Sequence, residues 1–186
     1  FQTDAPSDGF DWLAQLNWKP SRGVELYARV RHQDRARNTA DDVDGIDPLV
    51  RVEQTNYRVN ATYKVSNSVS LRTRVETVDF QRGTAPLRHG VLIYQDLVHR
   101  PLSSPLELSL RFALFDTESF DARLFAYESE LIGVFAIPPY YGRGIRWYAM
   151  ARLTPLRGVD LWVRYGAFIY QDQDVISSGL QEIPGN

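Results

Sequence analysis

Hydrophobic and polar residues alternate one by one along most of the chain. Every second residue from Phe10 to Trp18 is apolar, and all the residues between them except Leu13 are polar. Successive side chains of a β-strand point to opposite faces, so an alternation of this kind predicts a strand with one apolar and one polar face.

The same alternation recurs in segments 24–33, 56–65, 69–77, 90–99, 106–114, 145–153 and 159–167. Segment 90–99 is apolar on both sides in its first half, so the pattern leaves its orientation open. Two shorter strands, at 124–127 and 131–137, are the weakest predictions. The chain thus has about ten predicted strands and no amphipathic helix, which indicates an all-β fold with more strand than most globular domains contain.

The connections between these segments fall into two classes. Those at 19–23, 66–68, 100–105 and 154–158 are short, whereas 34–50 is long, polar and acidic, and 79–88 and 138–144 fall on the same side as the long one. Short turns on one rim and longer loops on the other are typical of transmembrane β-barrels. We therefore predict an antiparallel, up-and-down transmembrane β-barrel.

A soluble β-sandwich or a lipocalin-type barrel produces the same alternation, with the apolar face in its core. Strand length favours the membrane barrel. Most segments are close to the ~9 to 11 residues that cross a bilayer at a tilt, whereas soluble strands average ~5 to 6 residues.

Aromatic and basic residues divide between the two predicted faces. Aromatic residues on the apolar faces are candidates for an interfacial girdle: they are Trp12, Trp18, Tyr57, Tyr63, Trp147 and Tyr165. Of the 21 basic residues only Lys19 and Lys64 are lysines, and the polar faces are dense in arginine. The candidate lumen-facing residues are Arg29, Arg31, Arg58, Arg72, Arg74, Arg111, Arg146, Arg152 and Arg164. Such a stripe forms either ladders of ion pairs with Glu and Asp or an electropositive path for anions.

The remaining composition argues against an active site. The chain has no cysteine and a net charge of −2, so thiol chemistry and disulfides are excluded. His32, His89 and His99 share no ligand spacing, and the acidic residues from Asp41 to Asp47 lack the EF-hand pattern. We predict no catalytic residues, no metal and no cofactor.

Short segments over nearly the whole chain carry a more specific signal. They are Asp4-Ala5-Pro6-Ser7, Asp11-Trp12-Leu13, Lys19-Pro20-Ser21, Tyr94-Gln95-Asp96-Leu97, Phe115-Asp116-Thr117, Ala126-Tyr127-Glu128, Pro139 to Gly144, Arg146-Trp147-Tyr148, Leu161 to Tyr165, Ser178-Gly179-Leu180 and Glu182-Ile183. With these segments the chain resembles the C-terminal part of the β-barrel region in helix-hairpin-helix-containing outer-membrane proteins of Bacteroidota and related bacteria.

The resemblance implies a location and a set of partners. Family members carry an upstream helix-hairpin-helix region related to DNA-uptake proteins, which these 186 residues lack, so a nucleic-acid partner is not supported by this chain. The family ends in a further strand with a terminal aromatic residue, and this sequence stops before one. We therefore expect additional strands, from the same polypeptide or from partner outer-membrane proteins, to complete the barrel.

These inferences give one functional expectation for residues 1–186, taken as a single domain. We expect part of a porin-like, non-enzymatic barrel in the outer membrane of a Gram-negative cell, in contact with membrane lipid and contributing to a channel or transport-associated assembly with an Arg-lined lumen. The sequence is also compatible with a plugged scaffold or partner-binding barrel, with an outer-membrane hydrolase and with a soluble β-sandwich that acts as a binding module.

Overall fold

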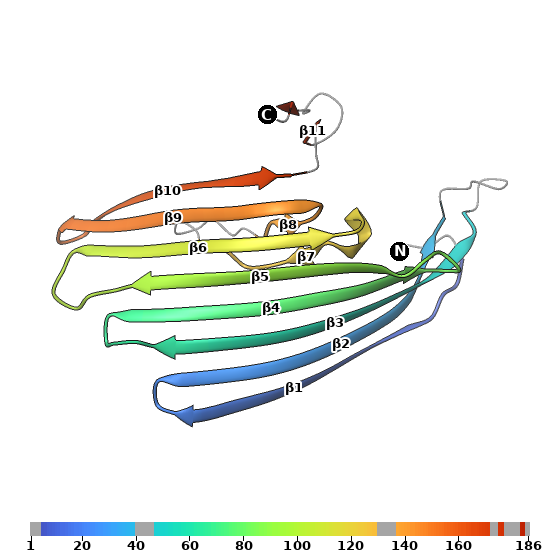
Figure 1. The fold of residues 1–186 in the computed structure, drawn as a ribbon, viewed down its shortest axis with the longest axis horizontal. Helices are drawn as coiled ribbons and strands as arrows, with labels where there is room; N and C mark the ends of the chain where they lie inside the picture. Colours follow the sequence, from blue (N-terminus) through green and yellow to red (C-terminus); the bar gives the residue numbers. More distant parts are fainter. Residues whose placement is uncertain (1–4, 40–46, 130–136, 172–174, 177–182, 185–186) are drawn as a thin grey trace.

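Eight long antiparallel strands form one sheet (Figure 1). The structure is a computed structural model that describes residues 5–39, 47–129, 137–171, 175–176 and 183–184. The strands of the sheet are β1 (Gly9–Ser21), β2 (Val24–Asn38), β3 (Leu49–Lys64), β4 (Val69–Arg82), β5 (Arg88–His99), β6 (Leu106–Thr117), β9 (Arg143–Leu156) and β10 (Val159–Tyr170).

Each strand pairs with its neighbour in sequence, except that β6 pairs with β9. The residues between them, 118–142, contain a short 3₁₀ turn, η1 (Phe120–Ala122), and two-residue strands β7 (Leu124–Phe125) and β8 (Pro139–Tyr140), which pair with each other. We call the described residues 118–129 and 137–142 the inward segment, because β7 and β8 lie behind the sheet in Figure 1. A further pair, β11 (Val175–Ile176) and β12 (Ile183–Pro184), follows β10.

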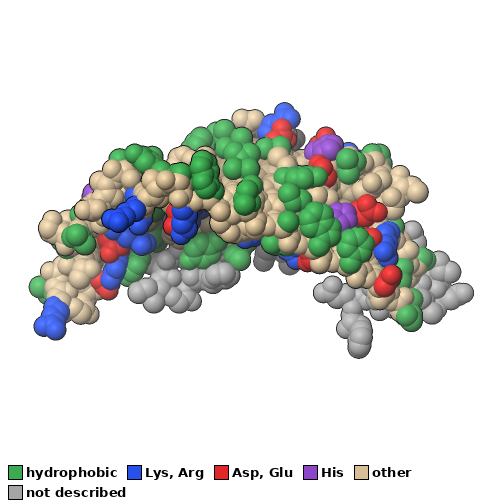
Figure 2. Space-filling view, turned by 90° about the horizontal axis from the view of Figure 1, so that it is seen from below, with side chains coloured by type: hydrophobic (Ala, Val, Ile, Leu, Met, Phe, Trp, Pro, Cys, Tyr) green, Lys and Arg blue, Asp and Glu red, His purple; other side chains and the backbone are tan. Residues whose placement is uncertain are grey.

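The register of the strands places the alternating apolar and polar side chains on opposite faces of the whole sheet. For example, Trp12 pairs with His32 and Ala14 with Val30 on one face, whereas Gln15 pairs with Arg29 on the other. Figure 2 shows the molecule as an arch that is hollowed on one side, with many hydrophobic side chains on the convex side. The convex face is the predicted apolar face, and its large side chains are exposed; Trp18 is 61% exposed and Tyr165 66%.

A small hydrophobic core lies on the concave face, under the inward segment. Val78, Phe80, Leu92 and Phe115 of β4, β5 and β6 pack there with Leu124 and other residues of the inward segment. Gly90 allows the close approach, because a Cβ atom at this position would meet the backbone oxygen of Ala122. The core therefore covers only part of the concave face, and most other side chains on that face are polar, arginines above all.

The eight long strands confirm the strongest predictions from the sequence, and the short connections share one rim, at the left of Figure 1. Strand β2 extends to Asn38 and strand β3 begins at Leu49. The connection between them is therefore shorter than the predicted connection 34–50. The orientation of segment 90–99 is now defined: Leu92 and Tyr94 face the concave side, and Val91 and Ile93 the convex side.

Two expectations need correction. The strand predicted at 124–127 spans only Leu124–Phe125 and does not join the main sheet, because it pairs with β8. The connection predicted at 138–144 contains β8 and the start of β9. The strand predicted at 131–137 falls, apart from Ile137, outside the described residues. The sheet that the described residues form is not closed, as expected for a barrel that is incomplete in this chain, and β1 and β10 lie at its edges. That further strands complete a barrel stays a prediction. No helix in the described ranges is long and apolar enough to cross a membrane.

Candidate functional site

All nine arginines singled out by the sequence lie on the concave face. The strand pairings place Arg29, Arg31, Arg58, Arg72, Arg74, Arg111, Arg146, Arg152 and Arg164 on the same side of the sheet. In the described part of the chain, this face bears the inward segment and grooves lined by arginine. That it lines a lumen remains a prediction.

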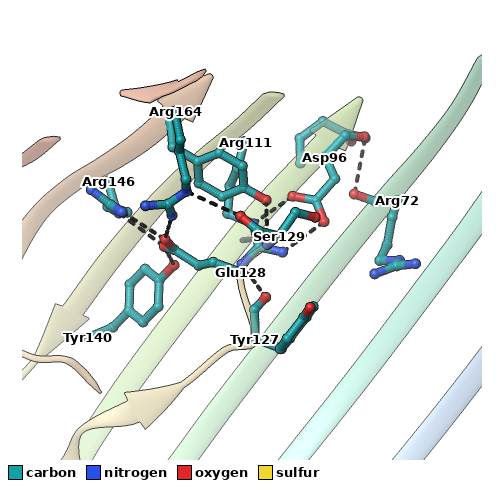
Figure 3. A network of polar contacts seen from close by, with 11 residues as sticks. Arg72, Asp96, Arg111, Tyr127, Glu128, Ser129, Tyr140, Arg146 and Arg164 are labelled. Atoms are coloured by element: carbon teal, nitrogen blue, oxygen red, sulfur yellow. Dashed lines mark hydrogen bonds and ion pairs between the residues drawn. The ribbon is translucent and has the colours of Figure 1, made fainter. Parts of the chain in front are cut away.

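Three of these arginines hold the inward segment at Glu128 and its neighbours, and the Glu128 side chain is completely buried (Figure 3). Arg146 of β9 donates two hydrogen bonds to the Glu128 carboxylate, Nε to Oε1 at 3.0 Å and Nη2 to Oε2 at 2.7 Å. Arg164 of β10 also donates to Oε2, and the Tyr140 hydroxyl donates to Oε1 at 2.8 Å. We call Glu128 with these three partners the Glu128 clamp.

The backbone next to Glu128 is held as well. Arg111 of β6 binds Asp96 of β5 with two hydrogen bonds, at 2.6 and 2.8 Å, and its Nη1 donates to the Tyr127 carbonyl at 2.8 Å. The Ser129 N–H donates to the Tyr148 hydroxyl at 3.2 Å, and the Ser129 carbonyl accepts from Arg164. Bidentate, charge-assisted hydrogen bonds are among the strongest in proteins, so the inward segment is fixed to β6, β9 and β10.

The charges in the clamp determine the protonation of Glu128. Burial raises the pKa of Glu128, but the hydrogen bonds from Arg146 and Tyr140 and the positive charges of Arg146 and Arg164 outweigh burial, so the net pKa lies below the ordinary value of 4.5. Burial, and then the charge of Glu128, raises the pKa of the Tyr140 hydroxyl. Glu128 is therefore ionised and Tyr140 neutral at physiological pH.

Aromatic rings support the guanidinium groups around Glu128. Arg164 lies over the ring of Tyr148 at 4.6 Å, Arg146 over Phe168 at 4.5 Å, and Arg111 over Tyr94 at 3.9 Å. A cation above an aromatic face is attracted to the ring quadrupole, more strongly when water is excluded. The concave face thus combines charge with aromatic packing.

A groove lies between strands β1 to β4 and the first part of the inward segment. It has a volume of about 460 Å³. Among the described residues, its lining includes Arg29, Arg31, Arg35, Arg37, Arg58 and Arg123, together with two acidic residues, Glu76 and Asp121. We call it the Arg groove. Arg58 binds Glu76 with two hydrogen bonds of 2.7 Å, and Arg31 binds Asp11.

The other predicted arginines lie nearer the short turns. Arg72 and Arg74 line a second groove, of about 520 Å³, together with Lys19 and Glu25. Arg152 bridges Glu107 of β6 at 2.9 Å and Asp160 of β10 at 3.0 Å. Ion pairs therefore account for Arg31, Arg58, Arg111, Arg146, Arg152 and Arg164, and those across neighbouring strands tie the sheet together.

All six predicted interface aromatics, Trp12, Trp18, Tyr57, Tyr63, Trp147 and Tyr165, lie on the convex face. Trp18 and Tyr63 lie close to the short turns that end β1 and β3, whereas Trp147 and Tyr165 form a contact pair with ring centroids 5.4 Å apart within β9 and β10. Only part of the set is therefore at strand ends. Their contact with lipid remains a prediction.

Three polar pairs mark the end of the apolar convex face on the side of the longer connections. They are Asp34–Arg51 across β2 and β3, Asp79–His89 across β4 and β5, and Asp116–Arg143 across β6 and β9, with distances of 2.6, 2.7 and 2.8 Å. We call them the rim pairs. Each lies next to a connection on the same rim, so the change from apolar to charged surface follows the rim of the sheet.

The histidines do not come together. His32 hydrogen-bonds Thr55 and contacts the rings of Phe10 and Trp12, and His89 belongs to a rim pair. Within the described ranges no three His, Asp or Glu side chains are grouped to hold a metal ion. No serine is hydrogen-bonded to His32 or His89 in that part of the chain.

Sequence reasoning missed the centre of the site. Glu128, Asp96 and Tyr140 were not candidate residues, although all three lie within segments that carry the family resemblance. A signal was present: Phe80, Leu92 and Phe115 break the polar pattern of the concave face. These apolar residues mark where the inward segment packs.

Comparisons with protein-family models, with curated proteins and with solved structures found no match to this chain.

Proposed function

We propose that this chain is part of the wall of an outer-membrane β-barrel that has no enzymatic activity and contributes to a channel or transport-associated assembly. The observation that carries the proposal is the convex face. Exposed apolar side chains extend across the sheet, from Leu16 of β1 to Ile169 of β10, and the rim pairs bound them on one side. Water-soluble proteins rarely expose so extensive an apolar surface, whereas lipid favours it.

The open edges support completion by further strands. Within the described residues, strands β1 and β10 each have a neighbouring strand on one side only, so part of their backbone N–H and C=O groups lack ladder partners there. In a bilayer each unsatisfied group costs several kcal/mol. Additional strands of the same polypeptide, or strands of a partner outer-membrane protein, would satisfy them and close the barrel. The family resemblance favours the same arrangement.

The polar concave face supports a lumen. Arginines and their acidic partners are stable there if water fills the interior, as in barrels that conduct solutes. The inward segment also favours a second candidate, the plugged scaffold or partner-binding barrel, because the Glu128 clamp holds a chain segment against the wall at the place where a pore would run.

No such observation favours a soluble β-sandwich or an outer-membrane hydrolase. A sandwich needs a second layer on the convex face, and the described residues place none there. A serine hydrolase needs a nucleophile beside a histidine, and the His89–Asp79 pair on the rim has no serine hydrogen-bonded to it in the described chain.

Fractionation of cells that make the full-length protein tests the proposal. The protein should accompany the outer membrane, and its migration in SDS gels should change on boiling, which indicates a closed barrel. In planar bilayers an open lumen lined by arginine should favour anions, whereas a plugged barrel should conduct poorly. Recovery of the protein in the soluble fraction without detergent would refute the membrane proposal.

A further inference from the structure

The Arg groove has an excess of positive charge that its own walls do not neutralise. Six arginines and two acidic residues of the described chain line it, which gives these side chains a net charge of +4. Asp11, which pairs with Arg31 from beside the groove, lowers the excess to three charges. An interior that served only to tie strands together would need about one acid for each arginine.

The excess is concentrated at Arg35 and Arg37 of β2. Arg31 and Arg58 have carboxylate partners, Arg29 donates to the Gln15 side chain at 2.7 Å, and Arg123 is 4.0 Å from Asp121. No carboxylate of the described chain pairs with Arg35 or Arg37. The Nε of Arg35 is buried and has no hydrogen-bond partner among the described residues, although buried donors in proteins are nearly always satisfied.

We propose that the Arg groove binds a small solute that carries two or more phosphate groups. This deepens the proposed function and rests on it, because it takes the concave face to be open to solutes. Guanidinium groups bind phosphate oxygens with paired, directional hydrogen bonds. Arg35 and Arg37 are two positions apart on one face of β2, about 6.7 Å, so their guanidinium groups can bind separate phosphates of one molecule.

The size and walls of the groove fit such a solute. Its volume of about 460 Å³ is within the range of ~300 to 1,000 Å³ typical of small-molecule sites. Phe80, Leu124 and Phe125 provide apolar wall on the side of the inward segment, which suits the organic part of a phosphorylated metabolite. A single chloride ion would leave most of the space and most of the charge unsatisfied.

Calorimetric titration of the purified full-length protein in detergent, with inorganic pyrophosphate as the probe, tests the proposal. The wild-type protein should bind pyrophosphate saturably and about one to one, and the affinity should fall as salt is added. The double variant Arg35→Gln/Arg37→Gln should lose at least tenfold in affinity. Arg37→Gln alone should lose part of this affinity, which guards against misfolding of the double variant.

The control variant Arg22→Gln/Arg157→Gln removes the same charge from two exposed arginines in the short turns, and it should bind like the wild type. Absence of saturable binding, or an equal loss in both double variants, would overturn the proposal. Binding of a single-stranded oligonucleotide without binding of pyrophosphate would also overturn it, in favour of a polymer.

The experiment separates this inference from the proposed function. Boiling-dependent migration of the same samples reports the barrel, and calorimetry reports the groove. A protein that binds pyrophosphate through Arg35 and Arg37 but does not form a membrane barrel would refute the proposed function and leave the groove assignment in place.

Discussion

Replacement of Glu128 by glutamine should release the inward segment from the wall. The change keeps the size of the side chain and removes its charge, so Arg146 and Arg164 lose the carboxylate that they share. Arg146 is 7% exposed and Glu128 is completely buried, so water cannot easily replace the lost partner. The inward segment should therefore detach while the strands stay paired.

The magnitude follows from the burial of the pair. Removing one partner of a buried ion pair typically costs about 3 to 5 kcal/mol, because the remaining charge is left uncompensated. A glutamine oxygen can still accept a hydrogen bond from Arg146 or Tyr140, so we expect the lower end, about 3 kcal/mol. At about 1.4 kcal/mol for each tenfold change, the detached state becomes roughly 100-fold more populated.

Amide hydrogen exchange measured by mass spectrometry on peptides covering 122–129 reports this population. Exchange there should become roughly 100-fold faster in Glu128→Gln, while peptides from β5 should exchange at the wild-type rate. The matched control is Glu107→Gln, which removes a carboxylate bound to Arg100 and Arg152 at the other rim, where the side chain is 31% exposed. Equal exchange over 122–129 in wild type and Glu128→Gln would refute the role of the clamp.

Three further predictions concern pH, packing and lipid contact. Because the folded-state pKa of Glu128 lies below 4.5, its contribution to docking is complete above that pH and is lost only as the pH falls through the folded-state pKa. A spin label at Phe125→Cys, in a chain without cysteine, should therefore gain mobility only in acid below about pH 4.5, and a transition near neutral pH would contradict this. Gly90→Ala should destabilise the docked inward segment by about 1 to 3 kcal/mol, which should lower the melting temperature. Gly23→Ala should have little effect, because the added Cβ atom would lie 3.5 Å from its nearest neighbour. Equal melting temperatures of the two variants would argue against close packing at Gly90. Val163→Arg, on the convex face, should make the free energy of folding into lipid vesicles about 2 to 4 kcal/mol less favourable, whereas Leu13→Arg, on the concave face, should leave it nearly unchanged. A larger cost for Leu13→Arg than for Val163→Arg would mean that the concave face, and not the convex face, contacts lipid.

The sequence was most informative where side chains alternate without interruption. Strands β1, β2, β9 and β10 were predictable because a sustained period of two is the signature of a strand with two different faces. The end of β2 and the start of β3 were not predictable, because both fall in the polar segment 34–50, which reads as a loop, although Asn38 pairs with Leu49 in the sheet. Backbone pairing with a neighbouring strand extends β2 and β3 there.

The centre of the site depends on contacts between residues distant in sequence. Glu128 is 18 residues from Arg146 and 36 from Arg164, and nothing in its local sequence marks it as the partner of either. Leu92 lies in the segment whose orientation the sequence leaves open, and Phe115 directly follows the predicted strand 106–114. Neither their common face nor what covers them follows from the sequence. The arginines share one face of the sheet because their positions depend only on strand periodicity, and that this face lines a lumen stays a prediction.

Lipid quenching of tryptophan fluorescence tests most directly whether the convex face contacts the membrane. Trp147 lies on the convex face and Trp162 on the concave face, beside Arg152, so two variants of the full-length protein that retain one or the other differ mainly in the face probed. In vesicles of brominated phospholipid, the emission of Trp147 should be strongly quenched and that of Trp162 should be nearly unchanged. Equal quenching of the two, or stronger quenching of Trp162, would contradict the assignment of the convex face to lipid.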